Sequence, residues 1–233
     1  MGIGSGTDVG NSGERSVAEM LANKRLTEIT VFDIGANKGQ FLAMVQSNLG
    51  AQLKEIHCFE PAATTFKTLS KNVTASDEIH LNNIGLSSEA GTAKLYYDKE
   101  NSGLASLTKR ELAFRNIEFG QEEEVSLSTV DDYCKDHGID RIHWLKLDIE
   151  GHELDALRGA SGMFGRKAIE IVTFEFGGCN IDTRTFFRDF FDFFSSIGMT
   201  IHRITPSGHF QPITRYRETE EQFNTVNFVA YVV

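Results

Sequence analysis

The segment 31–41 reads Val-Phe-Asp-Ile-Gly-Ala-Asn-Lys-Gly-Gln-Phe and combines an acid with several small residues. Gly35 and Gly39 free the backbone for a tight bend and for close approach to a ligand. Ala36 adds little bulk, and Asn37 is among the few non-glycine residue types that tolerate a positive φ. The spacing therefore predicts a turn that brings the backbone close to a bound molecule.

The glycine spacing restricts which nucleotide ligand fits. A dinucleotide fingerprint requires glycines at the first, third and sixth positions, and counting from Gly35 these are Gly35, Asn37 and Gln40. A phosphate-binding loop requires Gly-Lys-Ser/Thr, which is absent from this turn. The pattern Asp-x-Gly-x-x-x-Gly beginning at Asp33 resembles motif I of class I S-adenosylmethionine (SAM) methyltransferases. SAM carries an ammonium group and a carboxylate on its amino-acid tail. An acid such as Asp33 suits the ammonium group, and the N–H groups of the turn suit the carboxylate of that tail.

A second acid, Glu60, follows a predicted strand over 55–59. Doubly wound folds place an acid there that accepts hydrogen bonds from the ribose hydroxyls. The alternative is a charge favoured only by the dipole of the next helix, and we favour the ribose role. Pro61 is expected to start that helix. Asn83 and Gly85, after a third strand, are candidate adenine neighbours, although an ordinary strand-end turn explains them equally well.

A third group of polar residues follows the predicted strand 143–147: Asp148, Glu150, His152 and Glu153. Ligands of open α/β sheets bind at such carboxyl ends, and crowded like charges indicate a cation, substrate or metal as partner. We expect functional roles for Asp148 and Glu150 and a helix-terminal role for Glu153. His152 is a candidate base, although a lone turn histidine is more often structural.

Glu175 ends the next predicted strand as Asp148 ends the preceding one. Neighbouring carboxylates of this kind can hold a hard cation such as magnesium. Two candidate ligands are a weak signal, so the sequence favours no metal.

Hydrophobic periodicity and turn residues predict the elements that position these side chains. Strands are expected at 31–34, 55–59, 79–84, 93–97, 125–127, 143–147, 169–176, 199–204, 210–213 and 226–233. Helices are expected at 14–24, 41–49, 61–73, 126–137, 153–159 and 183–197. The last helix carries six phenylalanines, for which core packing is the default, and a partly exposed strip would indicate a homodimer surface or an acceptor pocket.

Composition restricts the class of protein. The 233 residues fit a tail and short helix over 1–28 followed by one domain over 29–233. The net charge of −10 argues against a general nucleic-acid partner. Three widely spaced cysteines predict reduced thiols of a cytoplasmic protein. No apolar run reaches the length of about 18 residues that suggests a membrane span.

Five segments together resemble the FkbM family of SAM-dependent methyltransferases, over about 31–175. They are Phe-Asp-Ile-Gly-Ala-Asn-Lys-Gly-Gln-Phe at 32–41, Phe-Glu-Pro at 59–61, Asn-Asn-Ile-Gly-Leu at 82–86, Ser-Thr-Val-Asp-Asp at 128–132, and Leu-Lys-Leu-Asp-Ile-Glu-Gly-His-Glu at 145–153 with Leu-Arg-Gly-Ala at 157–160. The resemblance implies an α/β, Rossmann-like class I fold with a mostly parallel seven-stranded sheet, helices on both faces and an antiparallel C-terminal strand. It also implies O-methylation of a sugar, glycan or natural-product hydroxyl with SAM as cofactor.

The expected chemistry is in-line transfer of the sulfonium methyl to an acceptor oxygen. Asp148 is our first choice as base, with Glu150 and His152 as alternatives, and Asp148 is also a candidate partner of the SAM ammonium. The residues expected to bind the cofactor are Asp33, Gly35, Ala36, Asn37, Gly39, Phe41, Glu60, Pro61, Asn83, Gly85 and Asp148. The loop 102–121 is expected to help select the acceptor.

Three alternative functions are kept. One is a metal-assisted O-methyltransferase that uses Asp148 and Glu175. Another is a nicotinamide-dependent oxidoreductase, against which the glycine spacing counts. The last is a non-catalytic module that binds SAM.

Overall fold

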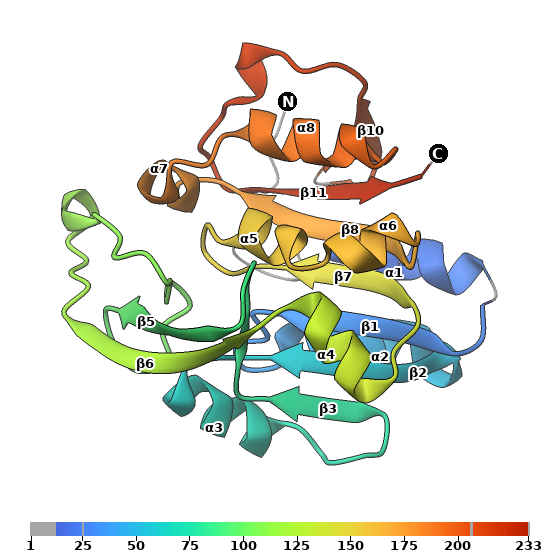
Figure 1. The fold of residues 1–233 in the computed structure, drawn as a ribbon, viewed down its shortest axis with the longest axis horizontal. Coiled ribbons are helices and arrows are strands. Elements are labelled where there is room, and N and C mark those ends of the chain that lie inside the picture. The colour runs from blue at the N-terminus through green and yellow to red at the C-terminus, as the bar shows by residue number, and fades with distance from the viewer. Residues whose placement is uncertain (1–12, 25, 206, 233) are drawn as a thin grey trace.

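The computed structural model describes residues 13–24, 26–205 and 207–232. Its centre is one sheet with the strand order β10-β9-β11-β8-β7-β1-β2-β3 (Figure 1). The bounds of these strands are β1 Ile29–Ile34, β2 Leu53–Phe59, β3 Ile79–Asn82, β7 Ile142–Leu147, β8 Ile169–Phe176, β9 Thr200–Ile204, β10 Phe210–Ile213 and β11 Val226–Tyr231. Strands β3, β2, β1, β7 and β8 run parallel, and β11 pairs antiparallel with β8 and with β9.

The predicted mostly parallel sheet with an antiparallel C-terminal strand is confirmed, but its predicted strand number is wrong. The sheet has eight strands instead of seven. The difference arises at the edge, where β10 turns back and pairs antiparallel with β9. The resemblance supplied the number seven, whereas the apolar pattern around 199–213 correctly indicated two strands there.

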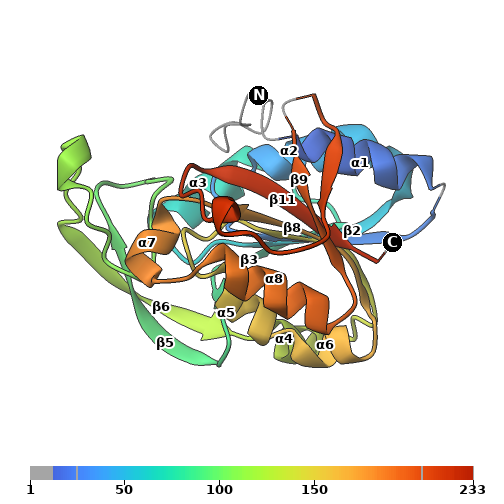
Figure 2. The ribbon, with the colours of Figure 1, turned by 90° about the horizontal axis from the view of Figure 1, so that it is seen from above.

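Helices cover both faces of the sheet, as predicted (Figure 2). One face carries α1 Glu14–Asn23, α2 Gln40–Leu49 and α3 Ala63–Asn72. The other carries α4 Val130–His137, α5 Glu153–Arg158, α6 Ser161–Gly165 and α8 Phe187–Ser196. The shorter elements are α7 Cys179–Thr183 and the 3-10 turns η1 Gly50–Gln52, η2 Ala113–Arg115 and η3 Glu218–Glu220.

Strand β1 is buried at all six positions because it lies between these two layers. Alternate side chains of a strand point to opposite faces. Phe32 and Ile34 join the core under α4, α5 and α8, whereas Ile29 and Val31 join the core under α1 and α2. A strand that is buried on both faces usually has an almost continuous apolar sequence. In β1 the acid Asp33 departs from this pattern.

A second sheet lies beside the main one at the left of Figure 1 and consists of β4 Gly85–Leu86, β6 Gln121–Ser128 and β5 Gly91–Tyr97. Its formation corrects two predicted boundaries. Strand β3 ends at Asn82 instead of residue 84, because the chain leaves the main sheet there to form β4. Helix α4 begins at Val130 instead of residue 126, because β6 continues to Ser128. The Thr129 hydroxyl then caps α4 by accepting the backbone N–H of Asp132.

The phenylalanine-rich helix is shorter than predicted. Helix α8 covers 187–196, because Phe186 has an extended backbone and its N–H donates to the Asp189 carboxylate. Phe187, Phe190 and Phe194 are fully buried, which confirms core packing as the main role of this face.

Three further predictions concern the chain as a whole. The tail predicted over 1–13 lies outside the described residues except for Gly13. Cys58, Cys134 and Cys179 are buried and form no disulfide, which confirms the predicted thiols. Over the part of the chain that the structure describes, no helix has the length and apolar character needed to cross a bilayer.

Candidate functional site

A cleft of about 720 Å³, including space open to solvent, lies at the carboxyl ends of β1, β2 and β7. Eight of the residues singled out from the sequence line it: Gly35, Asn37, Glu60, Pro61, Gly85, Asp148, Glu150 and His152. Most of them follow β1, β2 or β7, and the carboxyl ends of parallel strands meet at one edge of the sheet. Gly85 reaches the cleft from β4 of the second sheet.

The other five residues predicted to bind a cofactor do not line the cleft: Asp33, Ala36, Gly39, Phe41 and Asn83. Asn83 instead donates from its amide to the backbone oxygens of Glu60 and Pro61. Phe41 packs edge-on against Trp144, with 4.7 Å between the ring centroids. The side chains of Asn83 and Phe41 therefore make these contacts from outside the lining of the cleft.

The glycine turn brings two strand ends into close approach. Gly35 has a φ of +85°, and a Cβ at this position would lie 1.9 Å from the backbone oxygen of Asp148. The N–H groups of Gly35 and Ala36 both donate to the backbone oxygen of Phe59. Asn37 has a φ of +48°, as its residue type allows. Only glycine fits at position 35, because any side chain would separate β1 from the end of β7.

Glu60 lies in the cleft wall with its carboxylate held by two backbone groups. One oxygen accepts the N–H of Asn37 and the other accepts the N–H of Ala62, both at 3.0 Å. Burial raises the pKa of Glu60 to about 7, although these two hydrogen bonds lower it. The prediction that Pro61 starts the next helix is wrong by two residues, since α3 begins at Ala63 after an extended Ala62.

A buried ion pair lies beneath the glycine turn. Asp33 is fully buried, and its Oδ1 lies 3.0 Å from Nζ of Lys146 on β7. Lys146 also lies 3.5 Å from Asp148 and donates to the backbone oxygen of Gly35. Although burial opposes its charge, Asp33 and Asp148 raise the pKa of Lys146. The sequence analysis did not predict a role for this lysine. The available indication was a single charged residue within the apolar sequence of a buried strand.

The acids after β7 take different positions. Asp148 is the most accessible, with a side chain 44% exposed at the cleft. Glu153 is fully buried, and its Oε1 accepts the N–H groups of Ile149 and Gly151. Glu153 thus holds the loop in shape from below, while Asp148 faces the cleft.

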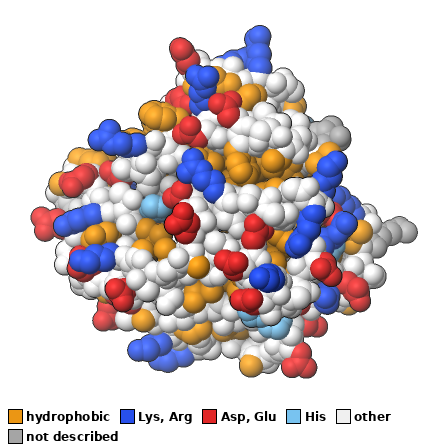
Figure 3. Space-filling model, in the orientation of Figure 1, with side chains coloured by type: hydrophobic (Ala, Val, Ile, Leu, Met, Phe, Trp, Pro, Cys, Tyr) orange, Lys and Arg blue, Asp and Glu red, His pale blue; other side chains and the backbone are white. Residues whose placement is uncertain are grey.

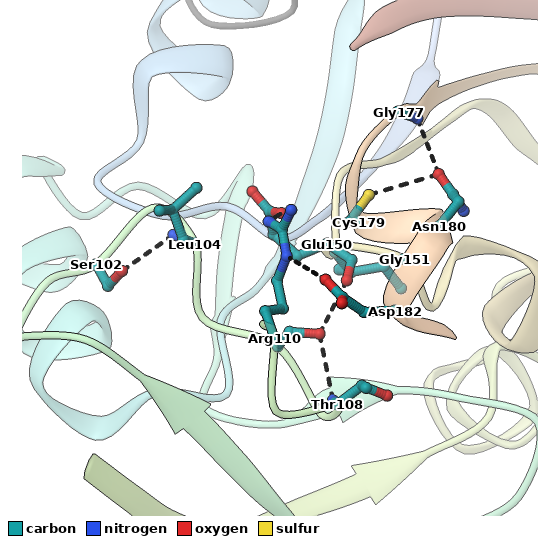
Figure 4. A network of polar contacts seen from close by, with 12 residues as sticks. Ser102, Leu104, Thr108, Arg110, Glu150, Gly151, Gly177, Cys179, Asn180 and Asp182 are labelled. Atoms are coloured by element: carbon teal, nitrogen blue, oxygen red, sulfur yellow. Dashed lines mark hydrogen bonds and ion pairs between the residues drawn. The ribbon is translucent and has the colours of Figure 1, made fainter. Parts of the chain in front are cut away.

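Glu150 joins a polar network with residues that sequence reasoning missed (Figure 4). The Arg110 guanidinium forms an ion pair with Glu150, and its Nε lies 3.3 Å from Asp182 (Figure 4). The Ser106 hydroxyl donates to the backbone oxygen of Glu150, which has a φ of +53°. Arg110 and Asp182 carried no usable signal, because neither lies in a recognisable motif or periodic segment.

His152 lines the cleft between two polar partners. Its Nδ1 lies 3.1 Å from the Asp155 carboxylate, and its Nε2 lies 3.0 Å from the Thr108 hydroxyl. A base needs a second group that fixes its ring and tautomer, and Asp155 is placed to do this. His152 therefore has the arrangement of an oriented proton acceptor.

The segment 98–120, which connects β5 to β6, forms one wall of the cleft through Ser102, Gly103, Ala105, Ser106 and Leu107. A Cβ at Gly103 would lie 3.4 Å from the side-chain nitrogen of Asn37, so the segment reaches the glycine turn. The loop that is expected to help select the acceptor therefore lines the cleft.

The two carboxylates of the metal-assisted alternative do not share the cleft. Asp148 lines the cleft, whereas Glu175 is buried on β8 and is absent from the cleft lining. Burial raises the pKa of Glu175, and the nearby acids Asp148 and Glu150 raise it further. The arrangement of these two residues therefore gives no specific support to that alternative.

Comparison with known proteins decides the family. A family model described as the methyltransferase FkbM domain matches residues 33–199, which is more than half of the chain. The chain belongs to the FkbM methyltransferase family. The resemblance inferred from the sequence motifs is thus confirmed.

Two curated relatives of this FkbM chain are methyltransferases. Methyltransferase sdnD of Sordaria araneosa is 31% identical over 155 residues, which cover 55% of this chain and 59% of that protein. Methyltransferase 1 of Beauveria bassiana (strain ARSEF 2860) is 24% identical over 144 residues, covering 55% and 57%. The matched regions span less than two thirds of both relatives.

A solved structure supports the fold of the FkbM domain. The crystal structure of methyltransferase FkbM from Methylobacillus flagellatus KT has a TM-score of 0.52 and 17% identity, and the match covers 88% of this chain and 43% of that one. At this identity the likeness concerns the fold alone. The Rossmann-like architecture predicted from the sequence is confirmed.

Methyltransferase membership implies use of SAM, and the polar groups in the cleft fit that molecule chemically. Buried Glu60 offers carboxylate oxygens suited to ribose hydroxyls, and accessible Asp148 offers one suited to an ammonium group. The bare backbone at Gly35 lets the chain approach a ligand closely. On the face shown in Figure 3, acidic and basic side chains of the described residues are interspersed, without a broad basic patch.

Proposed function

We propose that this chain is a SAM-dependent O-methyltransferase that acts on a small molecule or glycan with an acceptor hydroxyl. One observation carries the proposal. The cleft has Gly35, Glu60 and Asp148 on its sheet side and His152, oriented by Asp155, near the segment 98–120. Groups suited to a cofactor and a group suited to accept a proton therefore face the same space.

On the cofactor side, each residue has a distinct task. Glu60 holds the ribose hydroxyls, Asp148 holds the ammonium group, and the backbone at Gly35 allows close contact. When bound, SAM supplies a methyl group on a sulfonium that an oxygen nucleophile attacks. Lys146 contacts both Asp33 and Asp148 from beneath and holds the two carboxylates in place.

On the acceptor side, His152 accepts the hydroxyl proton at Nε2 while Asp155 stabilises the resulting imidazolium at Nδ1. In the structure the Thr108 hydroxyl lies 3.0 Å from Nε2, so the acceptor hydroxyl takes its place there when the acceptor binds. Asp148 was the first choice from the sequence. Its accessible side chain lies on the same side of the cleft as Gly35, which suits it to binding the ammonium group.

The walls of the cleft suggest the class of acceptor. Leu95, Ala105, Leu107 and Leu127 form an apolar surface, and Ser102 and Ser106 add hydroxyls. Such a wall suits an acceptor with an apolar body and few polar groups, such as a natural product. Holding that body fixes the reacting oxygen in line with the methyl group, which is the main source of acceleration in such transfers.

Calorimetric titration with SAM and with NADH tests the cofactor. We expect saturable binding of SAM and none of NADH, and the reverse result would contradict the proposal. Incubation of a cell extract and the protein with methyl-labelled SAM, followed by mass spectrometry, tests the reaction. A labelled small molecule whose label sits on oxygen supports the proposal. SAM binding without any labelled product would instead favour a non-catalytic module.

A further inference from the structure

A carboxylate and two imidazoles form a cluster outside the cleft, on strands β2 and β3. The residues are Glu55, His57 and His80, and one ligand atom from each lies within 4.8 Å of the others. Glu55 and His57 are two residues apart on β2 and share a face. His57 and His80 are directly paired in the β2–β3 register. Three side chains that commonly bind metal ions are thus brought together at one edge of the main sheet.

A chain of hydrogen bonds determines which nitrogen of His57 carries its proton. The Asn82 amide nitrogen donates to the backbone oxygens of Cys58 and His80, so its Oδ1 is the acceptor. The Tyr133 hydroxyl donates to this oxygen at 3.2 Å, which uses its only proton. His57 Nδ1 lies 2.9 Å from the Tyr133 hydroxyl and is therefore the donor in that contact. The neutral ring consequently presents a lone pair at Nε2.

That lone pair has an unfavourable neighbour. Nε2 of His57 lies 3.5 Å from the Glu55 carboxylate and has no hydrogen-bond partner among the described residues. The residue is only 2% exposed. A bare lone pair directed toward a carboxylate in a buried place is repelled unless a cation lies between them.

We propose that Glu55, His57 and His80 form a binding site for a divalent transition metal of the zinc class. Zinc prefers nitrogen and oxygen ligands at about 2.0–2.2 Å in a tetrahedral arrangement, which places ligand atoms about 3.3–3.6 Å apart. The observed separations from the Glu55 Oε2 atom are 3.5 Å to His57 and 4.0 Å to His80. Neither of these two separations exceeds the zinc spacing by as much as 1 Å, and all three ligand atoms lie within 4.8 Å of one another.

The surroundings of the cluster suit such a site. Metal-binding histidines usually donate their other ring N–H to a neighbouring group, as His57 does to Tyr133. The Thr30 hydroxyl and Lys54 both approach Oε1 of Glu55, which leaves Oε2 for the metal. The His80 side chain is 42% exposed, so a water molecule has access to the fourth position.

Metal binding requires one rearrangement. The rings of His57 and His80 are stacked with centroids 4.4 Å apart and an interplanar angle of 13°. A metal ion lies near the plane of each imidazole that binds it, so the two rings cannot stay parallel. His57 is held by Tyr133, and the exposed His80 ring is therefore the one that turns. The bound ion would connect β3, the edge strand of the main sheet, to its neighbour β2.

Zinc titration of tag-free protein, stripped with a chelator and then dialysed, tests the site. We expect one zinc ion per chain by calorimetry and metal analysis, with a rise in Tm. His80→Gln and Glu55→Gln should each weaken zinc binding at least 10-fold and remove the rise in Tm. The exposed His80 carries the main test because its substitution leaves the buried core intact.

His209→Gln is the matched control, since His209 is an exposed histidine between β9 and β10 at the opposite edge of the sheet. It should bind zinc as the unmodified protein does. Absence of stoichiometric zinc binding would overturn the proposal, and so would equal affinity in His80→Gln and His209→Gln. The test uses no SAM and no acceptor, so its outcome is independent of the proposed methyl transfer.

Discussion

The Glu60 carboxyl combines burial with a raised pKa of about 7, which makes its ionisation unfavourable in the folded state. The folded protein binds this proton more tightly than the unfolded chain does. Between about pH 4.5 and 7 the stability contributed by Glu60 is therefore lost as pH rises, by an amount on the order of 3 kcal/mol. The ionised form of Glu60 therefore lowers the stability of the folded protein, as expected for a group whose role is to bind a ligand.

Glu60→Gln should flatten this dependence. The free energy of unfolding of the variant, minus that of the unmodified protein, should rise between pH 4.5 and 7. Urea denaturation at several pH values measures it. Glu78→Gln, at an exposed glutamate in the loop before β3, is the control and should leave the profile unchanged. If the free energy of unfolding of Glu60→Gln changed with pH in the same way as that of the unmodified protein, the raised pKa of Glu60 would be contradicted.

Asp148 and His152 line the same cleft and are proposed for different tasks, which substitution separates. His152→Gln should lower kcat by about 10²–10⁴-fold and leave the Kd for SAM nearly unchanged, because it removes only the proton acceptor. Asp148→Asn should weaken SAM binding, since it removes a charge opposite the ammonium group. Calorimetry and initial rates measure both. If the two effects were exchanged, Asp148 would be the base, as first expected from the sequence.

At the scale of the elements, the junction between β1 and α2 depends on one missing side chain. Gly35→Ala adds a Cβ at a position where 1.9 Å separates it from the Asp148 backbone. Gly138 also has a positive φ of +66°, but nothing lies within 4 Å of a Cβ there. Gly138→Ala should cost about 1–2 kcal/mol through backbone conformation alone.

Gly35→Ala should cost several kcal/mol more than Gly138→Ala and should abolish SAM binding, because β1 and the end of β7 must separate. Urea denaturation and calorimetry measure the two effects. Similar costs for the two alanines would show that the strand ends can move apart freely.

The sequence predicted elements better than the contacts between them. Apolar periodicity located β1, β7 and β8. Glu60 and Asp148 each follow a predicted parallel strand, so both were correctly expected at the carboxyl-end edge of the sheet. The second sheet was not expected, because strand pairing depends on contacts distant in sequence. For the same reason the partners of Asp33 and Glu150 were missed. Lys146 was visible as a charge in an apolar strand, but no local pattern tells which acid it meets.

For the whole molecule, the three buried thiols report on local opening: Cys134 and Cys58 lie in the two cores, and Cys179 is buried in α7. Cys58, Cys134 and Cys179 are each at most 2% exposed, and burial raises the pKa of each thiol. A thiol reagent such as DTNB should therefore label none of them in the folded protein and all three in denaturant. Rapid labelling of the folded protein would show that a core opens locally.

The single tryptophan of the chain, Trp144, lies in β7 and is fully buried, with its indole N–H donating to Thr173. Its ring contacts Phe41, over which Lys146 lies with 5.4 Å between Nζ and the ring centroid. Lys146 in turn contacts Asp33 and the backbone of Gly35. The protein thus carries a built-in optical probe beneath the glycine turn. Its emission comes from one known environment, so events at that turn can be followed in solution without attaching a dye.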